Sequence, residues 1–158
     1  LAERQLNFLL NPNLNNKFPL FLNDETLGYN FGVQGLQFVA TSTTAENQML
    51  SNPMYVHSIS SNNDNQDIVS MGTNSALITK KVIDNSFQVM SIHISSICQA
   101  IDCLPEEDFK KLSSNTLKVY NLIRNIIPVI KNDMPQAENL KKVVEYLKTK
   151  TINLWNVH

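Results

Sequence analysis

The sequence predicts an all-α protein, a bundle built around one long helix. Hydrophobic residues make up 42% and charged residues 17% of the 158 residues, which is the balance of a folded chain. Apolar residues recur at helical spacing, and no segment of useful length shows the apolar–polar alternation of a half-buried strand. The clearest helical segment runs from about residue 67 to residue 103 and contains no proline.

Two helices are expected before that segment. Residues 2–10 predict a helix that ends where a proline follows, because proline cannot continue the helical hydrogen-bond ladder. Residues 11–30 are rich in asparagine and predict a loop. A second helix is expected from about Gly32 to Leu50 and is again ended by an Asn-Pro pair. Residues 53–66 predict a polar connection that finishes in a run of turn-forming side chains.

The long helix over residues 67–103 carries an apolar seam with alternating steps of four and three residues. The seam consists of Ile83, Phe87, Met90, Ile94, Ile97 and Ile101. A helix of this length would span about 50 Å, more than a compact domain of this size needs. Further apolar residues flank the seam, so the helix should have neighbours on several sides. If its apolar surface were exposed it would drive association, so we expect a multi-helix bundle that is oligomeric.

The last third of the chain predicts two further helices. Pro105 ends the long helix, and the acidic residues after it suit a new helix N-terminus. A helix is expected over about residues 114–127, where Pro128 kinks or ends it. The last helix is expected over residues 135–150, and Asp133-Met134-Pro135-Gln136 has the form of a capping box at its start.

Charge and cysteine content argue against several classes of site. The formal net charge is −1, and no Lys/Arg cluster is long enough to suggest a phosphate-binding surface or a nucleic-acid partner. Cys98 and Cys103 have no His or Cys partners at zinc spacing, so we expect ordinary thiols of a reducing compartment and no metal site. No apolar run reaches the roughly 18–20 residues of a membrane span. The chain opens without an initiator Met or a signal peptide, so we expect a piece of a longer protein.

Three stretches carry a resemblance to a known family. The first comprises Ala2-Glu3-Arg4-Gln5, Leu10-Asn11-Pro12 and Phe18-Pro19-Leu20-Phe21-Leu22. The second comprises Gly35-Leu36-Gln37, Ala45-Glu46-Asn47-Gln48 and Asn52-Pro53. The third and most specific comprises Asn65-Gln66-Asp67-Ile68-Val69-Ser70-Met71-Gly72 and then Cys98-Gln99-Ala100-Ile101-Asp102. In their order and spacing they resemble the aromatic amino-acid ammonia-lyase and aminomutase family over about residues 2–104.

The resemblance implies the C-terminal part of a fumarase/aspartase-like helical fold, with residues 1–158 as a single helical segment of a longer cytoplasmic lyase. Family members eliminate ammonia from phenylalanine, tyrosine or histidine with a methylidene-imidazolone (MIO) formed from an Ala-Ser-Gly tripeptide. The family carries that tripeptide and its catalytic tyrosine in an N-terminal part, so we expect no catalytic residue in this chain and no activity of the chain alone. The implied partners are its own N-terminal portion, the other protomers of a homotetramer and a small amino-acid substrate.

The resemblance also implies four substrate-binding residues. Gln66 matches an active-site position at the entrance to the long helix, where a carboxamide can donate and accept hydrogen bonds. Histidine-specific members carry Glu there, so Gln66 favours a phenylalanine- or tyrosine-type substrate, although a histidine lyase and a tyrosine 2,3-aminomutase stay open. Asn65 matches a neighbouring pocket position of tyrosine-specific relatives, and Asn62 falls where plant phenylalanine members have Glu. Val33 falls where many members place Phe beside the electrophile, so it leaves more space there.

Plainer interpretations stand beside these. Gln66 and Asn65, like Asp67, could cap the long helix, and Val33 could be an ordinary core residue. Structural roles are expected for Glu46, as a paired carboxylate, and for His57 and His93, whereas Asp102, Lys80 and Lys81 are expected to be solvated or interface charges. From another class of function, the chain could be a non-catalytic helical module that assembles with itself or with a full-length lyase.

Overall fold

The structure, a computed structural model, describes residues 1–23 and 28–150. Within these ranges the regular elements are helices, and an isolated antiparallel bridge joins Ser61 to Gln66. The elements are α1 (Ala2–Leu10), α2 (Pro12–Asn15), η1 (Leu20–Leu22), α3 (Gln34–Met49), η2 (Met54–His57), α4 (Gly72–Asp102), α5 (Glu106–Phe109), α6 (Ser114–Arg124) and α7 (Ala137–Thr149). The predicted all-α class is therefore confirmed.

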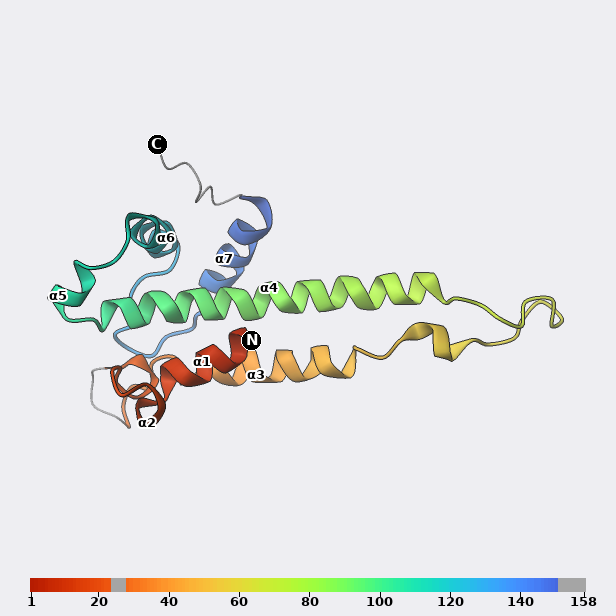
Figure 1. Cartoon of the computed structure of the whole chain (residues 1–158), viewed down its shortest axis with the longest axis horizontal. Helices are drawn as coiled ribbons and strands as arrows, with labels where there is room; N and C mark the ends of the chain where they lie inside the picture. Colours follow the sequence, from red (N-terminus) through yellow and green to blue (C-terminus); the bar gives the residue numbers. More distant parts are fainter. Residues whose placement is uncertain (24–27, 151–158) are drawn as a thin grey trace.

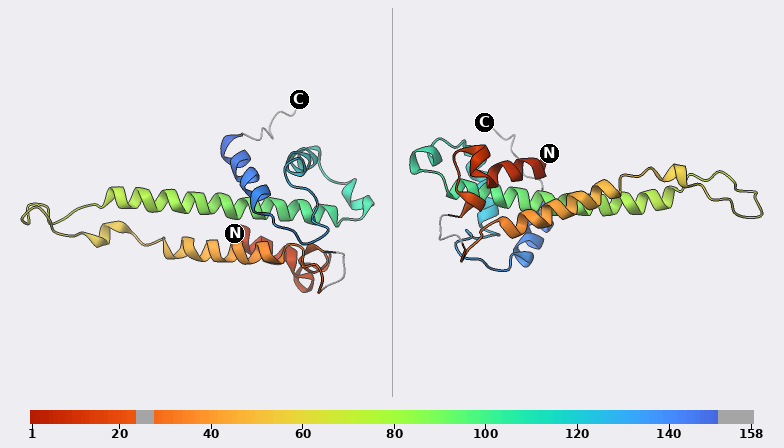
Figure 2. Two further views of the ribbon diagram at one scale, coloured as in Figure 1. Left: turned by 180° about the vertical axis from the view of Figure 1, so that it is seen from behind. Right: turned by 90° about the horizontal axis from the view of Figure 1, so that it is seen from below.

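The longest helix, α4, is the axis of the molecule (Figure 1). Its 31 residues correspond to about 46 Å at the usual helical rise. Helices α1 and α3 lie along one side of α4, and α6 and α7 pack on the other side (Figures 1 and 2). A helix with neighbours on opposite sides needs more than one apolar stripe, which agrees with the broad apolar circumference expected from the sequence.

Helix α4 begins five residues later than predicted, because the residues before it are bonded elsewhere. The Ser58 hydroxyl donates to the carbonyl of Asp67 (3.1 Å) and accepts the N–H of Val69 (2.7 Å). These backbone groups of residues 67 and 69 are thus bonded to Ser58, in the part of the connection that follows η2. Met71 then has a left-handed backbone with φ 52°, which a right-handed helix cannot include.

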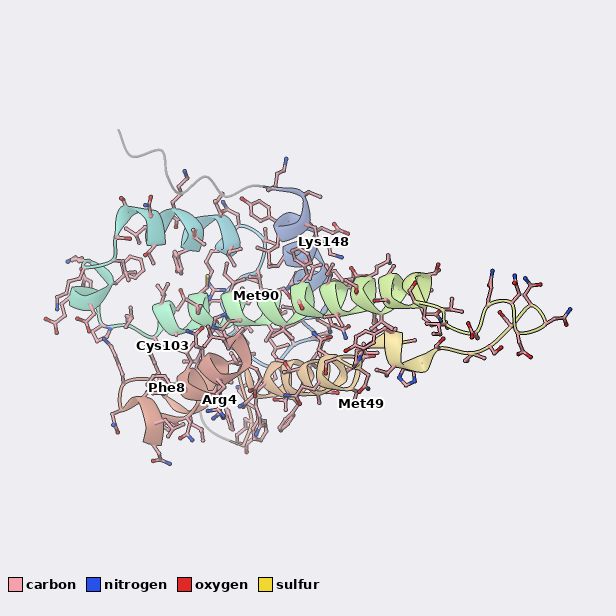
Figure 3. All side chains as sticks on the ribbon, turned by 45° about the vertical axis from the view of Figure 1, so that its right-hand side comes forward. Arg4, Phe8, Met49, Met90, Cys103 and Lys148 are labelled. Carbon is pink, nitrogen blue, oxygen red and sulfur yellow. The ribbon has the colours of Figure 1, made fainter. Side chains whose placement is uncertain are left out.

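Two hydrophobic cores lie on opposite sides of α4. The first joins α1, η1 and α3 to α4 through Leu6, Leu10, Leu22, Val33, Ala40, Ile92 and Ala100. The second joins α6 and α7 to α4 through Cys98, Ile123, Ile127 and Val143. At the far end of α7, Lys148 reaches back to α4 (Figure 3). There its ammonium pairs with Asp84, whose carboxyl pKa it lowers, and lies 5.3 Å from the centre of the Phe87 ring.

The predicted seam of α4 is divided, because Ile101 is 7% exposed and Ile94 packs against the second core, whereas three other members are exposed. Ile83 is 50% exposed, Met90 47% and Ile97 36%. The face of α4 that is buried within the chain carries smaller and more polar side chains, among them Asn85, Ser91, Ser95, Ser96 and Ala100. The hydroxyls of Ser95 and Ser96 donate to carbonyls one turn back, at 2.7 and 2.8 Å. Small side chains that are satisfied in this way leave room for the neighbouring helices to pack closely.

The first and last thirds of the chain mix confirmed and corrected boundaries. Helix α1 matches its prediction, and α3 begins two residues later and ends one residue earlier than predicted. The predicted loop over residues 11–30 contains two short helices that were not predicted, α2 and η1. Asn15 explains α2, because its amide donates to the carbonyls of Phe8, Leu9 and Asn11 at 2.8–3.1 Å and so bonds the open carbonyls at the end of α1.

The predicted capping box before the last helix is wrong. Helix α7 begins after Gln136, which makes no side-chain capping bond. The Asp133 carboxylate accepts hydrogen bonds from Phe31 and Gly32 instead. The preceding helix, α6, ends at Arg124 rather than at residue 127, and the Ser113 hydroxyl caps its start by accepting the N–H of Thr116.

Candidate functional site

Residues 50–71 form an arm that joins α3 to α4. Three of the four predicted substrate-binding residues lie at the tip of this arm. The arm begins beyond Met49 (Figure 3) and projects past the ends of both helices (Figure 2). Ser61 and Gln66 exchange backbone hydrogen bonds of 3.0 and 3.3 Å, and the N–H of Asn65 donates to the carbonyl of Asn62 at 3.1 Å. Asn62, Asn65 and Gln66 are all exposed, so their side chains are available to another surface.

The turn at the tip depends on asparagine and aspartate. Asn62, Asn63 and Asp64 have φ values of 55°, 55° and 62°, in the left-handed region that these two residue types adopt more readily than others. The Ser60 hydroxyl donates to the Asp64 carboxylate at 2.6 Å. The alternative that Gln66 and Asn65 cap the long helix is wrong, because α4 starts at Gly72 without a side-chain cap.

Val33, the fourth predicted residue, lies in the first core and is 1% exposed. It precedes α3, whereas the arm follows α3, so the 16 residues of that helix, about 24 Å, separate Val33 from the start of the arm. A surface hollow of about 530 Å³ lies at the base of the arm, between the ends of α3 and α4, and none of the four residues lines it. One chain therefore does not bring the four residues together.

Gly32 fixes the backbone immediately before Val33. Its φ is +54°, and a Cβ at this position would lie 2.7 Å from the carbonyl oxygen of Phe21. We expect Gly32→Ala to destabilise the protein by at least ~1–2 kcal/mol, the cost of a left-handed alanine, with the clash in addition. Gly35→Ala is the matched control, because a Cβ there meets nothing within 4 Å and Gly35 lies in the first turn of α3 without a positive φ. Urea unfolding measures both changes, and equal effects of the two would contradict this account.

The motif Cys98–Asp102 forms structural contacts between α4 and the last third of the chain. The Gln99 amide donates to the carbonyl of Ile130 at 2.9 Å, and its oxygen accepts the N–H of Ile130 at 3.1 Å. The Asp102 carboxylate forms an ion pair with Arg124 and accepts the hydroxyl of Tyr120. Burial and this carboxylate raise the pKa of the tyrosine. Asp102 was expected to be a solvated or interface charge, and the structure corrects this to a partner of α6, because Arg124 lies on α6 facing it.

The expected structural role of Glu46 is confirmed. Its carboxylate accepts the amide of Asn85 at 2.7 Å and pairs with Lys81 at 3.5 Å. The same Asn85 amide donates to Asn47 at 2.9 Å, so a polar bridge links α3 to α4. Lys80 and Lys81 keep side chains that are 79% and 54% exposed, in agreement with the solvated charges expected there.

The two described histidines named in the sequence analysis differ in burial. His57 is exposed in η2, whereas His93 is 8% exposed on α4 and its Nε2 has no hydrogen-bond partner among the described residues. Burial lowers the pKa of His93 below its ordinary 6.5. Burial also disfavours the charged form of Cys98, and it raises the pKa of this thiol to about 11. Within residues 1–23 and 28–150, no group of three His, Cys, Asp or Glu residues could hold a metal ion.

The lowered pKa of His93 predicts a loss of stability in mild acid. Below pH 6.5 the unfolded chain binds a proton at His93 more readily than the folded chain does, so the free energy of unfolding falls as the pH falls towards the folded-state pKa. We expect His93→Gln to flatten the dependence between pH 6.5 and 5, whereas His57→Gln, in the exposed η2, should leave it intact. Urea unfolding over that range measures both variants. A wild-type stability that does not change over the range would contradict the prediction.

Sequence similarity alone would not have identified several residues that organise the structure. Arg124 and Tyr120 lie after the dense part of the resemblance, and the pattern around Asp133 predicts a helix cap. Their partners are 18 to 103 residues distant along the chain, so no local sequence pattern predicts these contacts.

The described helices include none that is long and apolar enough to cross a membrane.

Comparison with known proteins defines the class. The chain matches a tyrosine ammonia-lyase from Cupriavidus metallidurans with 31% identity over 94% of this chain and 27% of that protein. It matches a histidine ammonia-lyase from Staphylococcus saprophyticus with 34% identity over 94% of this chain and 29% of that protein. The chain spans less than a third of the length of these two relatives.

A solved structure and a family profile agree with this class. The structure of tyrosine aminomutase from Streptomyces globisporus superimposes with a TM-score of 0.86 and 34% identity, over 92% of this chain and 27% of that one. A tyrosine 2,3-aminomutase of Streptomyces globisporus is named as MIO-dependent. The profile described as aromatic amino acid lyase matches residues 1–125. The chain belongs to the aromatic amino acid lyase family.

Proposed function

We propose that this chain is the C-terminal part of a cytoplasmic aromatic amino-acid ammonia-lyase, and that it supplies substrate-binding residues rather than catalytic ones. The observation that carries the proposal is the Asn65-Gln66 pair, exposed at the tip of a projecting arm in a chain of this family. Gln66 favours a phenylalanine- or tyrosine-type substrate, because histidine-specific members of the family that the chain resembles carry Glu at the matching position. Its neutral carboxamide can both donate and accept hydrogen bonds.

The pocket in this proposal is composite. Within one chain Val33 precedes α3 and Gln66 lies at the tip of the arm beyond its other end, so they border the same substrate only if different protomers contribute them. The exposed apolar residues of the arm support such an assembly, since Tyr55 is 72%, Ile59 67% and Ile68 89% exposed. Apolar surface of this kind is normally covered by another protein surface. We propose a homotetramer, in which the arm of one protomer reaches the surface of another.

The reactive group would come from outside this chain. The sequence contains no Ala-Ser-Gly tripeptide, so its residues do not fit the formation of a methylidene-imidazolone, which supplies an electron-poor alkene in this family. The contribution of this chain is to bind and orient the amino acid, for which Gln66, Asn65 and Asn62 offer amide donors and acceptors. Val33 is 1% exposed in the first core, so within one chain it is a core residue. The chain alone is proposed to be inactive.

An absorbance assay on the intact protein tests the proposal. Phenylalanine or tyrosine should give cinnamate or coumarate, and a β-amino acid product would identify an aminomutase instead. Urocanate from histidine as the sole product would refute the interpretation of Gln66. An intact protein that converts none of the three amino acids would favour the non-catalytic helical module.

Gln66→Glu provides a test of the residue itself. We expect kcat/KM for phenylalanine or tyrosine to fall about tenfold or more, because the carboxylate loses a donor and repels the substrate carboxylate. Gln48→Glu makes the same chemical change at an exposed position of α3 and should leave kcat/KM within about twofold of wild type, as expected for surface substitutions. Equal effects of the two substitutions on kcat/KM would contradict a role of Gln66 in substrate binding.

A further inference from the structure

The outer part of the arm has no buried side chains to hold it in shape. Residues 58–68 are all exposed, and a two-stranded hairpin without a packed face is only marginally stable in water. The pairing register of such a hairpin is weakly specified, and a slip by one residue turns every side chain of a strand to the opposite face. The direction of the Gln66 side chain therefore depends on the hydrogen bonds that cross the arm.

Below the turn at residues 62–65, two links join the halves of the arm, in which the structure describes every residue. At the tip, the backbone groups of Ser61 and Gln66 exchange bonds of 3.0 and 3.3 Å. Nearer the base, the hydroxyl of Ser58 accepts the N–H of Val69 at 2.7 Å and donates to the carbonyl of Asp67 at 3.1 Å. Because Asp67 follows Gln66 directly in the chain, Gln66 is held between the two links.

The second link depends on the hydroxyl group of Ser58. A hydroxyl can donate one hydrogen bond and accept others, so a single short side chain satisfies the two backbone groups on either side of Ile68. An alanine at position 58 would keep neither bond, whereas a threonine would keep the hydroxyl. Gln66 itself is exposed, so its carboxamide is accessible to a ligand while its backbone is fixed.

We propose that Ser58 is a positioning residue for Gln66: its hydroxyl fixes the register of the arm and so sets the face on which the Gln66 carboxamide lies. This inference rests on the proposed function, in which Gln66 binds the aromatic amino acid. A binding group that is fixed before the substrate arrives loses less conformational entropy on binding. Ser58 thus acts on substrate affinity through Gln66, without touching the substrate.

The test uses the intact protein and two readouts, amide hydrogen exchange at residues 66 and 69 and steady-state kinetics with phenylalanine and tyrosine. Ser58→Ala should raise exchange about tenfold at Val69, which loses its acceptor. It should also raise exchange at Gln66, whose N–H bonds to Ser61 rather than to Ser58. KM should rise about fivefold while kcat changes by less than about twofold, as expected for weaker substrate binding with unchanged chemistry.

Two variants control this experiment. Ser58→Thr retains the hydroxyl and should keep exchange and KM within about twofold of wild type. Ser51→Ala also removes an exposed serine hydroxyl from the arm, but that hydroxyl bonds to the nearby carbonyl of Gln48 at 2.6 Å and does not cross the arm. It should resemble wild type in both readouts, as expected for a surface substitution.

A double-mutant cycle with Gln66→Ala distinguishes positioning from a general loss of structure. If Ser58 acts through Gln66, Ser58→Ala should raise KM by less than about twofold once Gln66 is already alanine. The same fivefold rise in that background would show that Ser58 acts independently of Gln66 and would overturn the inference.

Two further results would overturn the inference while the proposed function stands. Unchanged exchange at Gln66 in Ser58→Ala would show that the register does not depend on the hydroxyl. Raised exchange with an unchanged KM would show that the register does not affect substrate binding. A wild-type protein that converts neither phenylalanine nor tyrosine would instead overturn the proposed function, and with it the role of Ser58, even where exchange shows the link itself.

Discussion

Replacing Asp102 by asparagine should destabilise the protein by about 3 kcal/mol, towards the lower end of the range for breaking a buried ion pair. The side chains of Asp102 and Arg124 are 14% and 11% exposed, so the guanidinium would keep its charge in a largely dry site without a counter-charge. Tyr120 would retain a neutral acceptor, so most of the loss should come from the unpaired charge.

A double-mutant cycle isolates this ion pair. Arg124→Met should also be destabilising, because it leaves the Asp102 carboxylate unpaired, but the double variant should cost less than the sum of the two single variants. Lys110→Ala is the surface control, since its ion pair with Glu106 joins side chains that are 70% and 82% exposed and should contribute less than ~1 kcal/mol. Urea unfolding measures all four variants. Additive losses in the cycle would mean that Asp102 and Arg124 do not depend on one another.

Where a proline ends a helix, the sequence predicted the helix boundaries closely. A proline after residue 10 and an Asn-Pro pair after residue 51 bounded α1 and α3 to within two residues. The start of α4 was wrong because the Ser58 hydroxyl captures Asp67 and Val69. Helical periodicity depends only on the residues of one segment, so it cannot predict a hydrogen bond from another segment that competes with helix formation.

The candidate site shows a similar division. Gln66, Asn65, Asn62 and Val33 were named from resemblance, and their roles in substrate binding remain predictions. Their arrangement could not be predicted, because the hairpin turn that presents Gln66 depends on three left-handed residues in succession. Asp133 was misread since its four-residue pattern suits a helix cap locally, whereas two backbone amides about a hundred residues earlier in the chain are better donors for its carboxylate.

Ile92→Ala should destabilise the protein by about 3 kcal/mol, within the range for large-to-small substitutions in a core. Ile92 is 0% exposed and belongs to the core that joins α1, η1 and α3 to α4. Removing three of its carbons leaves a cavity between helices that are fixed by other contacts, so the site cannot collapse to fill it. Urea unfolding measures the loss, and a change below about 1 kcal/mol would show that this face of α4 is loosely packed.

Ile83→Ala is the matched control on the same helix, because the helix propensity changes by the same amount and the side chain is 50% exposed. In the isolated chain we expect a loss below ~1 kcal/mol, as for surface substitutions. The two variants separate two uses of one helix. Ile92 stabilises the chain itself, whereas the exposed seam residues Ile83, Met90 and Ile97 remain available to another protein surface. Ile83→Ala should therefore weaken self-association of the intact protein, measured by analytical ultracentrifugation. If Ile83→Ala instead cost as much as Ile92→Ala in the isolated chain, the seam would have to pack within one molecule.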